Sequence, residues 1–291
     1  MERGVFLALL AYAFWAFADA LIKQLGKTIG VFEVGLVLTS ISLGTALVLK
    51  PREEKVRDVF RLRHPWLMQG IATLRVISGV SLTYAFMTLP LAEAYSLGFL
   101  IPATSTILSV IFLKEDVRAE RWLFIAISFA GVLLVVRPGF GELQWGHLAM
   151  VACVVAHAAS SALTRFVSSN ERRISLLIVP PIYTVAFNLL MVLILGFQVP
   201  NLTEAALMVA CGVFGGVGSV LYINAISTAP VSRVEPMNYS QIVWALVLGA
   251  FFFGEIPDTL AIVGMVVVVL GGIGAIYADN LRARWSRLRA V

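Results

Sequence analysis

PLAEAYSLGFLIPATSTILSVIFLKE (90–115) and PVSRVEPMNYSQIVWALVLGAFFFGE (230–255) are two stretches of 26 residues that each run from a proline to a glutamate. An offset of 140 residues relates them. Near the start of each half of the chain, ADALIKQL (18–25) resembles SSALTRFV (160–167) at an offset of 142. These similarities are few, but they share nearly one offset, and they indicate an internal repeat.

The composition places the repeat in a membrane. Of the 291 residues, 59% are hydrophobic and 13% are charged, whereas a soluble domain has about 25% charged residues. The apolar runs are about 18–22 residues long, enough for a helix to cross a hydrocarbon core of about 30 Å. Helices satisfy their own backbone hydrogen bonds, as lipid requires. We predict ten spans, at 4–23, 31–49, 66–88, 92–113, 121–137, 145–165, 175–197, 203–228, 232–253 and 259–278.

Lysine and arginine gather in alternate loops. The basic segments are 50–63, 114–121, 165–173 and 282–289, whereas the opposite loops carry few cations. The positive-inside rule therefore predicts that both termini are cytoplasmic. We expect the protein to lie in the cell inner (plasma) membrane. The rule also explains the net charge of +5 without a nucleic-acid partner. The N-terminal run imitates a signal peptide, but the many later spans favour an uncleaved first helix.

Each half contains five predicted spans, so the second half must be inverted relative to the first. The charges agree, because the basic residues after the first copy of the motif are absent after the second. Inverted repeats around a midplane site are typical of transporters. We therefore predict an all-α polytopic membrane protein in which ten transmembrane helices form two inverted five-helix repeats around a central cavity. The repeats are 1–140 and 141–280, followed by a basic cytoplasmic tail at 281–291.

The motifs PLAEA…FLKE and APVSRVEP…FFFGE, together with two halves of five helices, resemble the EamA-domain members of the drug/metabolite transporter superfamily. The resemblance covers essentially the whole chain, and it departs at LKED, where family members often have Gly-Glu. It implies a ten-helix basket whose spans 1, 3, 4, 6, 8 and 9 enclose a cavity. It also implies solute transport, often export of amino acids, as in the YddG-type exporters.

Arg75 is the least expected residue for a lipid-facing helix, because it lies near the middle of the third span. An arginine at the bilayer centre costs about 3 kcal/mol on insertion scales. It should face a wet cavity or a partner, although its stem could also extend toward the interface. Its planar guanidinium suits a substrate carboxylate. A structural ion pair with Glu93 or Asp19 is the alternative.

Other polar and aromatic residues at similar depth are candidates for the substrate pathway. With Arg75, the set is Trp15, Asp19, Tyr84, Tyr95, His157, Tyr239 and Trp244. Three of the titratable residues could carry a proton: Asp19, His157 and Glu235. His157 could equally be a neutral histidine bonded to a neighbouring helix, and Glu235 could be a structural partner of Arg233.

Motifs of catalysis and metal binding are missing from the sequence. LGKTIG (25–30) lacks the upstream glycine of a phosphate loop, and Cys153 and Cys211 do not have metal-ligand spacing. We therefore expect no enzyme activity, no cofactor and no metal site. The expected function is a secondary transporter that exports amino acids or similar small polar metabolites by alternating access. The alternative is an uptake carrier for a vitamin or nucleoside-like metabolite. The expected partners are a small-molecule substrate and the lipid bilayer, and we expect a monomer or a homodimer.

Overall fold

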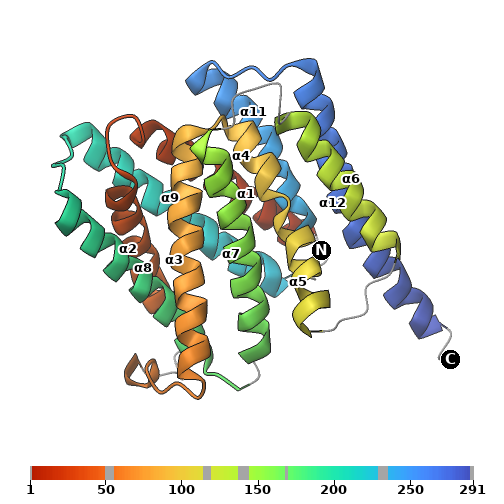
Figure 1. Cartoon of the computed structure of the whole chain (residues 1–291), viewed down its shortest axis with the longest axis horizontal. Helices are drawn as coiled ribbons and strands as arrows, with labels where there is room; N and C mark the ends of the chain where they lie inside the picture. The colour runs from red at the N-terminus through yellow and green to blue at the C-terminus, as the bar shows by residue number, and fades with distance from the viewer. Residues whose placement is uncertain are drawn as a thin grey trace. The chain divides into compact units, whose positions relative to one another are not determined.

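The computed structural model describes residues 2–49, 56–113, 119–136, 144–167, 170–228 and 235–288, and within them it contains helices and no strand (Figure 1). The α-helices are α1 (Glu2–Leu25), α2 (Val31–Leu49), α3 (Pro65–Thr88), α4 (Leu91–Gly98), α5 (Ile101–Leu113), α6 (Ala119–Val136), α7 (Trp145–Val167), α8 (Arg173–Leu195), α9 (Leu202–Thr228), α11 (Ser240–Phe253) and α12 (Thr259–Leu288). The 3₁₀ helices are η1 (Val56–Asp58) and η2 (Glu235–Tyr239). Six helical stretches are long and apolar enough to cross a membrane, and four shorter helices are also apolar.

Each of the ten predicted spans therefore coincides with a helix or a pair of consecutive helices. The fourth span is interrupted between Gly98 and Ile101, because Pro102 has no N–H to donate to the carbonyl of Gly98. The ninth span begins as η2 before it continues as α11. The last helix is longer than the predicted span 259–278: it extends to Leu288 and includes most of the predicted tail at 281–291. The predicted boundary between repeats, at residues 140 and 141, lies outside the described residues.

The chain divides into two compact units, and each takes helices from both halves of the sequence. Unit 1 comprises Met1–Ala16, Pro90–Gln144 and Gly218–Val291, and unit 2 comprises Phe17–Leu89 and Trp145–Val217. Helices α1 and α9 contribute to both units, since the divisions after Ala16 and Val217 fall inside them.

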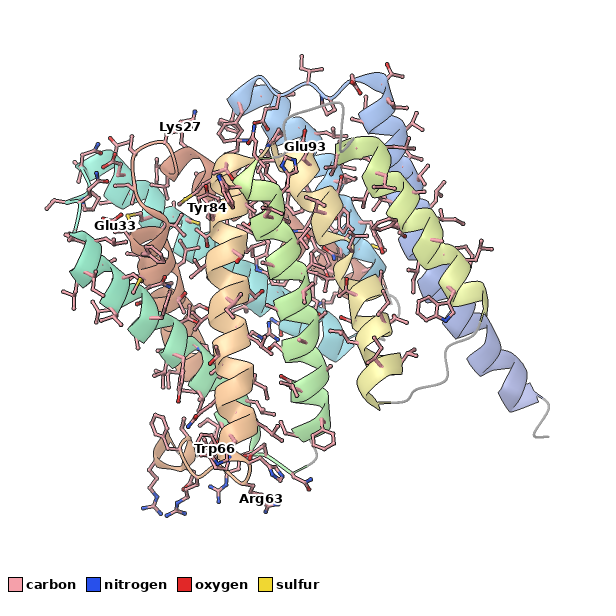
Figure 2. All side chains as sticks on the ribbon, in the orientation of Figure 1. Lys27, Glu33, Arg63, Trp66, Tyr84 and Glu93 are labelled. Carbon is pink, nitrogen blue, oxygen red and sulfur yellow. The ribbon has the colours of Figure 1, made fainter. Side chains whose placement is uncertain are left out.

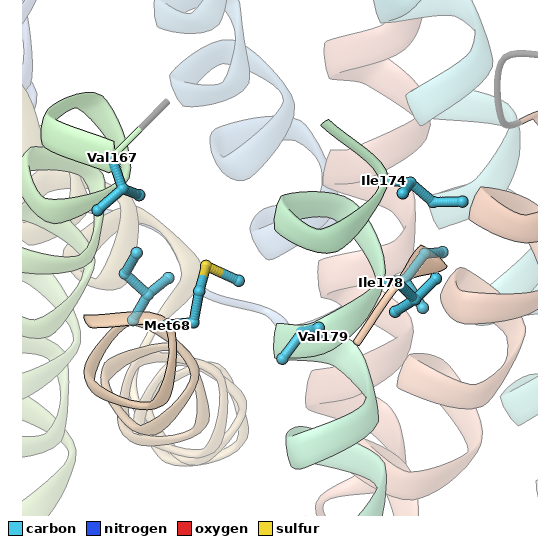
Figure 3. Packing of buried hydrophobic residues seen from close by; sticks show 7 residues of the cluster. Met68, Val167, Ile174, Ile178 and Val179 are labelled. Atoms are coloured by element: carbon cyan, nitrogen blue, oxygen red, sulfur yellow. The ribbon is translucent and has the colours of Figure 1, made fainter. Parts of the chain in front are cut away.

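In unit 2, α3 packs on α7 and α2 packs on α8. The members of each pair are antiparallel (Figure 1). The start of α7 lies against the end of α3, where Gly146 meets Leu89, and Gly70 near the start of α3 approaches Leu163 near the end of α7. Figure 3 shows a core of this unit, where buried side chains of α3, α7, α8 and the residue that follows η1 meet. The core residues are Val59, Met68, Ile71, Val167, Ile174, Ile178 and Val179.

In unit 1, α6 packs on α12 and α4 packs on α11, again in antiparallel pairs. Gly131 meets Gly264 where α6 and α12 cross. The amide of Leu91 at the start of α4 donates a 3.1 Å hydrogen bond to Oε2 of Glu255, just after the end of α11. Glu255 is the final residue of the second motif, so one repeat caps a helix of the other.

The packing shows that the repeat is inverted. At the offset of 140–142 residues, α2 corresponds to α8 and α6 to α12. Each of these helices packs against its own counterpart in antiparallel orientation. A two-fold axis in the membrane plane produces such contacts. The predicted inverted architecture is confirmed.

Two buried glutamates connect loops at opposite ends of unit 2. Glu33, at the start of α2, accepts hydrogen bonds of 2.7 Å from the amides of Gly30 and Gln198. Glu171, just before α8, accepts one from the amide of His64. The first glutamate therefore holds the connection between α8 and α9, and the second holds the connection between α2 and α3. These are corresponding loops of the two repeats.

Candidate functional site

Arg75 lies in the middle of α3 and is half-buried. Its guanidinium is within electrostatic range of Cys153 and His157 on α7. Ser78, about one turn further along α3, contacts Cys153 with an Oγ–Sγ distance of 3.5 Å. The antiparallel α3–α7 pair thus brings together two of the predicted pathway residues, Arg75 and His157.

No hydrogen bond or ion pair engages Arg75 among the described residues of unit 2, and this includes the predicted pairing with Asp19. Asp19 is half-buried on α1 and lies within electrostatic range of Cys211 on α9. The Cys211 thiol donates to the carbonyl oxygen of Ala18 at 3.2 Å. Within this unit the cation and the carboxylate therefore belong to different helix contacts, α3–α7 and α1–α9. A guanidinium that has no anionic neighbour in a membrane helix can bind the anionic group of a ligand.

In unit 1, three aromatic rings from α1 and α9 form one cluster. Trp15 lies 5.4 Å from both Tyr12 and Tyr222 between ring centroids, and Tyr12 lies 6.1 Å from Tyr222. The Trp15 indole lies over Gly218, where an added Cβ would be 2.7 Å from it. Met237 of η2 packs against the same cluster. Trp15 and Tyr222 remain half-buried, so this aromatic surface is partly accessible.

A second aromatic cluster in unit 1 joins α4 to η2. Phe99 lies 6.3 Å from Tyr95 and 5.0 Å from Tyr239 between ring centroids, and the Nε2 of Gln241 is 3.5 Å from the Tyr95 hydroxyl. Tyr239 lies directly against Gly272 of α12. Phe99 and Tyr239 are equivalent positions of the two repeats, at the offset of 140. They contact each other because residues near a two-fold axis meet their own counterparts.

The remaining predicted residues lie on separate elements. Tyr84 is half-buried near the end of α3, toward the opposite end from Trp66 (Figure 2), and Trp244 is half-buried on α11. Arg233 and the side chain of Glu235 lie outside the described residues. In the described part of the chain, no group of three or more His, Cys, Asp or Glu side chains is placed to hold a metal ion.

Sequence reasoning missed several residues of these clusters. Ser78 and Cys153 resemble ordinary small residues of a membrane helix, so nothing in the sequence distinguishes them. Phe99 could have been found, because it matches Tyr239 in the repeat. Gln241 is a polar residue in an apolar run and was a detectable signal.

Comparison with known proteins agrees with this architecture. A model of the EamA-like transporter family matches the chain twice, at residues 2–137 and 144–277. A solved crystal structure that is 19% identical superposes with a TM-score of 0.67, and the match covers 97% of this chain and 99% of that one. This likeness shows the fold.

Three relatives with similarity along most of the chain are transporters. An S-adenosylmethionine uptake transporter of Rickettsia bellii is 24% identical over 263 residues, which cover 90% of this chain and 89% of the relative. The pseudopaline exporter CntI of Pseudomonas aeruginosa is 29% identical over 279 residues, covering 94% and 95%. A riboflavin transporter of Rhizobium johnstonii is 22% identical over 224 residues, covering 77% and 74%. The chain belongs to the EamA-like transporter family and is a multi-pass membrane transporter of small metabolites.

Proposed function

We propose that this protein is a secondary carrier that exports amino acids or closely related zwitterionic metabolites across the inner membrane by alternating access. The observation that carries the proposal is Arg75. It is a half-buried cation in the middle of α3, and no described anion of its own unit neutralises it. The carboxylate of an amino acid would neutralise this charge and would accept two parallel hydrogen bonds from the guanidinium.

The relatives support an amino-acid-like substrate without deciding the direction of transport. S-adenosylmethionine is itself an amino acid, and its transporter is among the relatives. One relative is an uptake transporter and another is an exporter. A carrier follows whichever gradient it is given, so direction depends on conditions and coupling.

A second candidate function is uptake of a vitamin or nucleoside-like compound. It is favoured by the Tyr12–Trp15–Tyr222 cluster, since aromatic faces stack on planar heterocycles. A riboflavin transporter among the relatives points the same way. For this candidate, the aromatic cluster and not Arg75 would dominate recognition.

Counterflow in proteoliposomes tests both candidates without assuming a direction. Vesicles are loaded with an unlabelled solute, and entry of the same labelled solute is measured for amino acids, their decarboxylated amines, S-adenosylmethionine and riboflavin. We expect exchange of carboxylate-bearing solutes and not of the amines. Arg75→Ala should reduce this exchange about ten- to hundredfold, because a hydrogen bond to a charged group contributes about 1.5–3 kcal/mol. Arg75→Lys should retain part of it, since the charge remains but the planar fork is lost.

The control is Lys27→Ala, which removes an exposed cation at one end of unit 2 (Figure 2) and should leave exchange unchanged. Exchange of riboflavin alone, insensitive to Arg75→Ala, would replace the first candidate with the second. Equal exchange of amino acids and their amines would remove Arg75 from substrate recognition. Uptake into vesicles without preloaded solute, measured with and without a pH gradient, separates proton coupling through Asp19, His157 or Glu235 from facilitated diffusion, since only a coupled carrier then accumulates solute against its gradient.

A further inference from the structure

The connection between α2 and α3 is firmly attached to unit 2. Val59, which is 1% exposed, belongs to the buried core at this end. Its carbonyl oxygen accepts a 2.7 Å hydrogen bond from the hydroxyl of Ser175 on α8. Asp58 pairs with Arg172 at 3.0 Å, and Glu171 holds the amide of His64. These contacts place the described part of the connection, residues 56–64, in one defined position against the helices.

In this position, several aromatic and basic side chains of the connection and of the start of α3 are exposed. Phe60 and Trp66 are 67% and 81% exposed, although both are large and aromatic. Arg57 and Arg63, each three residues from one of these rings in the sequence, are exposed too. Figure 2 shows Arg63 and Trp66 at the end of α3 that lies opposite Lys27 and Glu33. Aromatic rings alternating with cations are typical of a protein surface at the level of lipid head groups.

Among the described residues of unit 2, only some of the charged side chains on this surface form ion pairs. Asp58 engages Arg61 at 3.1 Å as well as Arg172. Arg57 and Arg63 make no hydrogen bond or ion pair with any described residue of unit 2. Residues 56–66 therefore carry three arginines and one aspartate, a net charge of 3 − 1 = +2.

We propose that Arg57, Phe60, Arg63 and Trp66 form a binding site for the head group of an anionic phospholipid, such as phosphatidylglycerol, in the leaflet on the basic side of the membrane. The two arginines contact the phosphate, and the two rings lie at the boundary between head groups and acyl chains. A lipid is favoured over a soluble anion because the aromatic residues add an apolar contact that a free phosphate cannot use. This inference goes beyond the transport function and does not depend on the substrate.

Native mass spectrometry of the full chain in detergent tests the proposal, with phosphatidylglycerol and phosphatidylcholine titrated separately. We expect the wild type to bind phosphatidylglycerol roughly thirtyfold more tightly than phosphatidylcholine, the preference that two arginines near a membrane surface would provide. The preference should weaken in high salt. The double variant Arg57→Gln/Arg63→Gln should lose most of it.

Two controls make the outcome decisive. Lys27→Gln removes a cation at the opposite end of unit 2 and should leave the lipid preference intact. Phe60→Ser/Trp66→Ser keeps both arginines and should weaken phosphatidylglycerol and phosphatidylcholine alike. Equal phosphatidylglycerol affinity for wild type and the arginine double variant would overturn the site. Displacement of the lipid by millimolar inorganic phosphate would overturn it too, because the ligand would then be a free anion. All variants change exposed side chains, so circular dichroism should show unchanged helix content.

Discussion

Gly131 and Gly264 lie where α6 and α12 cross, and neither position has room for a side chain. A Cβ added at Gly131 would be 2.7 Å from both the carbonyl oxygen of Gly264 and the amide nitrogen of Val268. These are backbone atoms, which cannot move aside without displacing a whole helix. Small residues that allow close approach are a known basis of helix association in membranes.

We therefore expect Gly131→Ala to destabilise the protein by about 1–3 kcal/mol, the usual cost of overpacking. The measurement is thermal unfolding in detergent, followed by the loss of the monodisperse peak in size-exclusion chromatography. Gly44→Ala on α2 is the matched control, because a Cβ there meets nothing within 4 Å. Identical melting temperatures for the two variants would contradict the packing at the crossing.

For single residues, the sequence identified unusual side chains better than it identified the groups that these side chains contact. Arg75 was identifiable because a charge among apolar residues is costly and therefore informative. The role of Glu255 was not, because the amide that it binds belongs to Leu91, 164 positions earlier. Spacing along the chain cannot predict a hydrogen bond between a side chain and a distant backbone.

Helix boundaries were more predictable, because hydrophobic length determines a span. The second span was predicted at 31–49 and is observed as Val31–Leu49. The sequence analysis did not predict the break between α4 and α5, although Pro102 marks this position as a possible one. α8, by contrast, continues through Pro180 and Pro181. A proline therefore marks a possible break, and the surrounding packing decides whether the helix ends.

The start of α4 depends on Glu255, since the Leu91 amide has no carbonyl partner within its own helix. We expect Glu255→Ala to lower the stability by about 1 kcal/mol, as loss of a capping carboxylate does elsewhere. Glu255→Gln keeps an acceptor oxygen and should lose less. Hydrogen exchange of the first turn of α4 measures this directly. Faster exchange in Glu255→Ala than in wild type is the expected result, and unchanged exchange would mean that the contact contributes nothing.

For the whole molecule, the sequence predicted which helices of the two repeats correspond, but not which helices pack together. The offset identifies which helices correspond, and an odd number of spans per half predicts inversion. Neither observation says that α2 and α3 share a compact unit with α7 and α8, while α4 to α6 group with α11 and α12. That partition depends on side-chain shape and close packing, which a repeat in the sequence does not encode.

The orientation of the protein in the membrane remains a prediction from the basic loops, and cysteine labelling tests it. Cys153 and Cys211 are both buried, so the background reaction with a membrane-impermeant maleimide should be small. Lys27 and Arg63 are exposed at opposite ends of unit 2 (Figure 2). We expect Lys27→Cys to react in intact cells, and Arg63→Cys to react only after permeabilisation. The opposite pattern would reverse the predicted topology and place both termini outside.

The antiparallel helix pairs also determine when, during synthesis of the chain, these contacts can form. The described contacts of α2 with α8, α4 with α11 and α6 with α12 all join residues made early to residues made much later. At about 5–20 residues per second, the ribosome needs roughly 7–28 seconds to synthesise the 140 residues of offset between the two repeats. During that interval the spans of the first repeat have been made and their counterparts in the second repeat have not. We therefore expect the nascent first half, whose helices lack their packing partners, to be more sensitive to quality-control proteases than the completed chain.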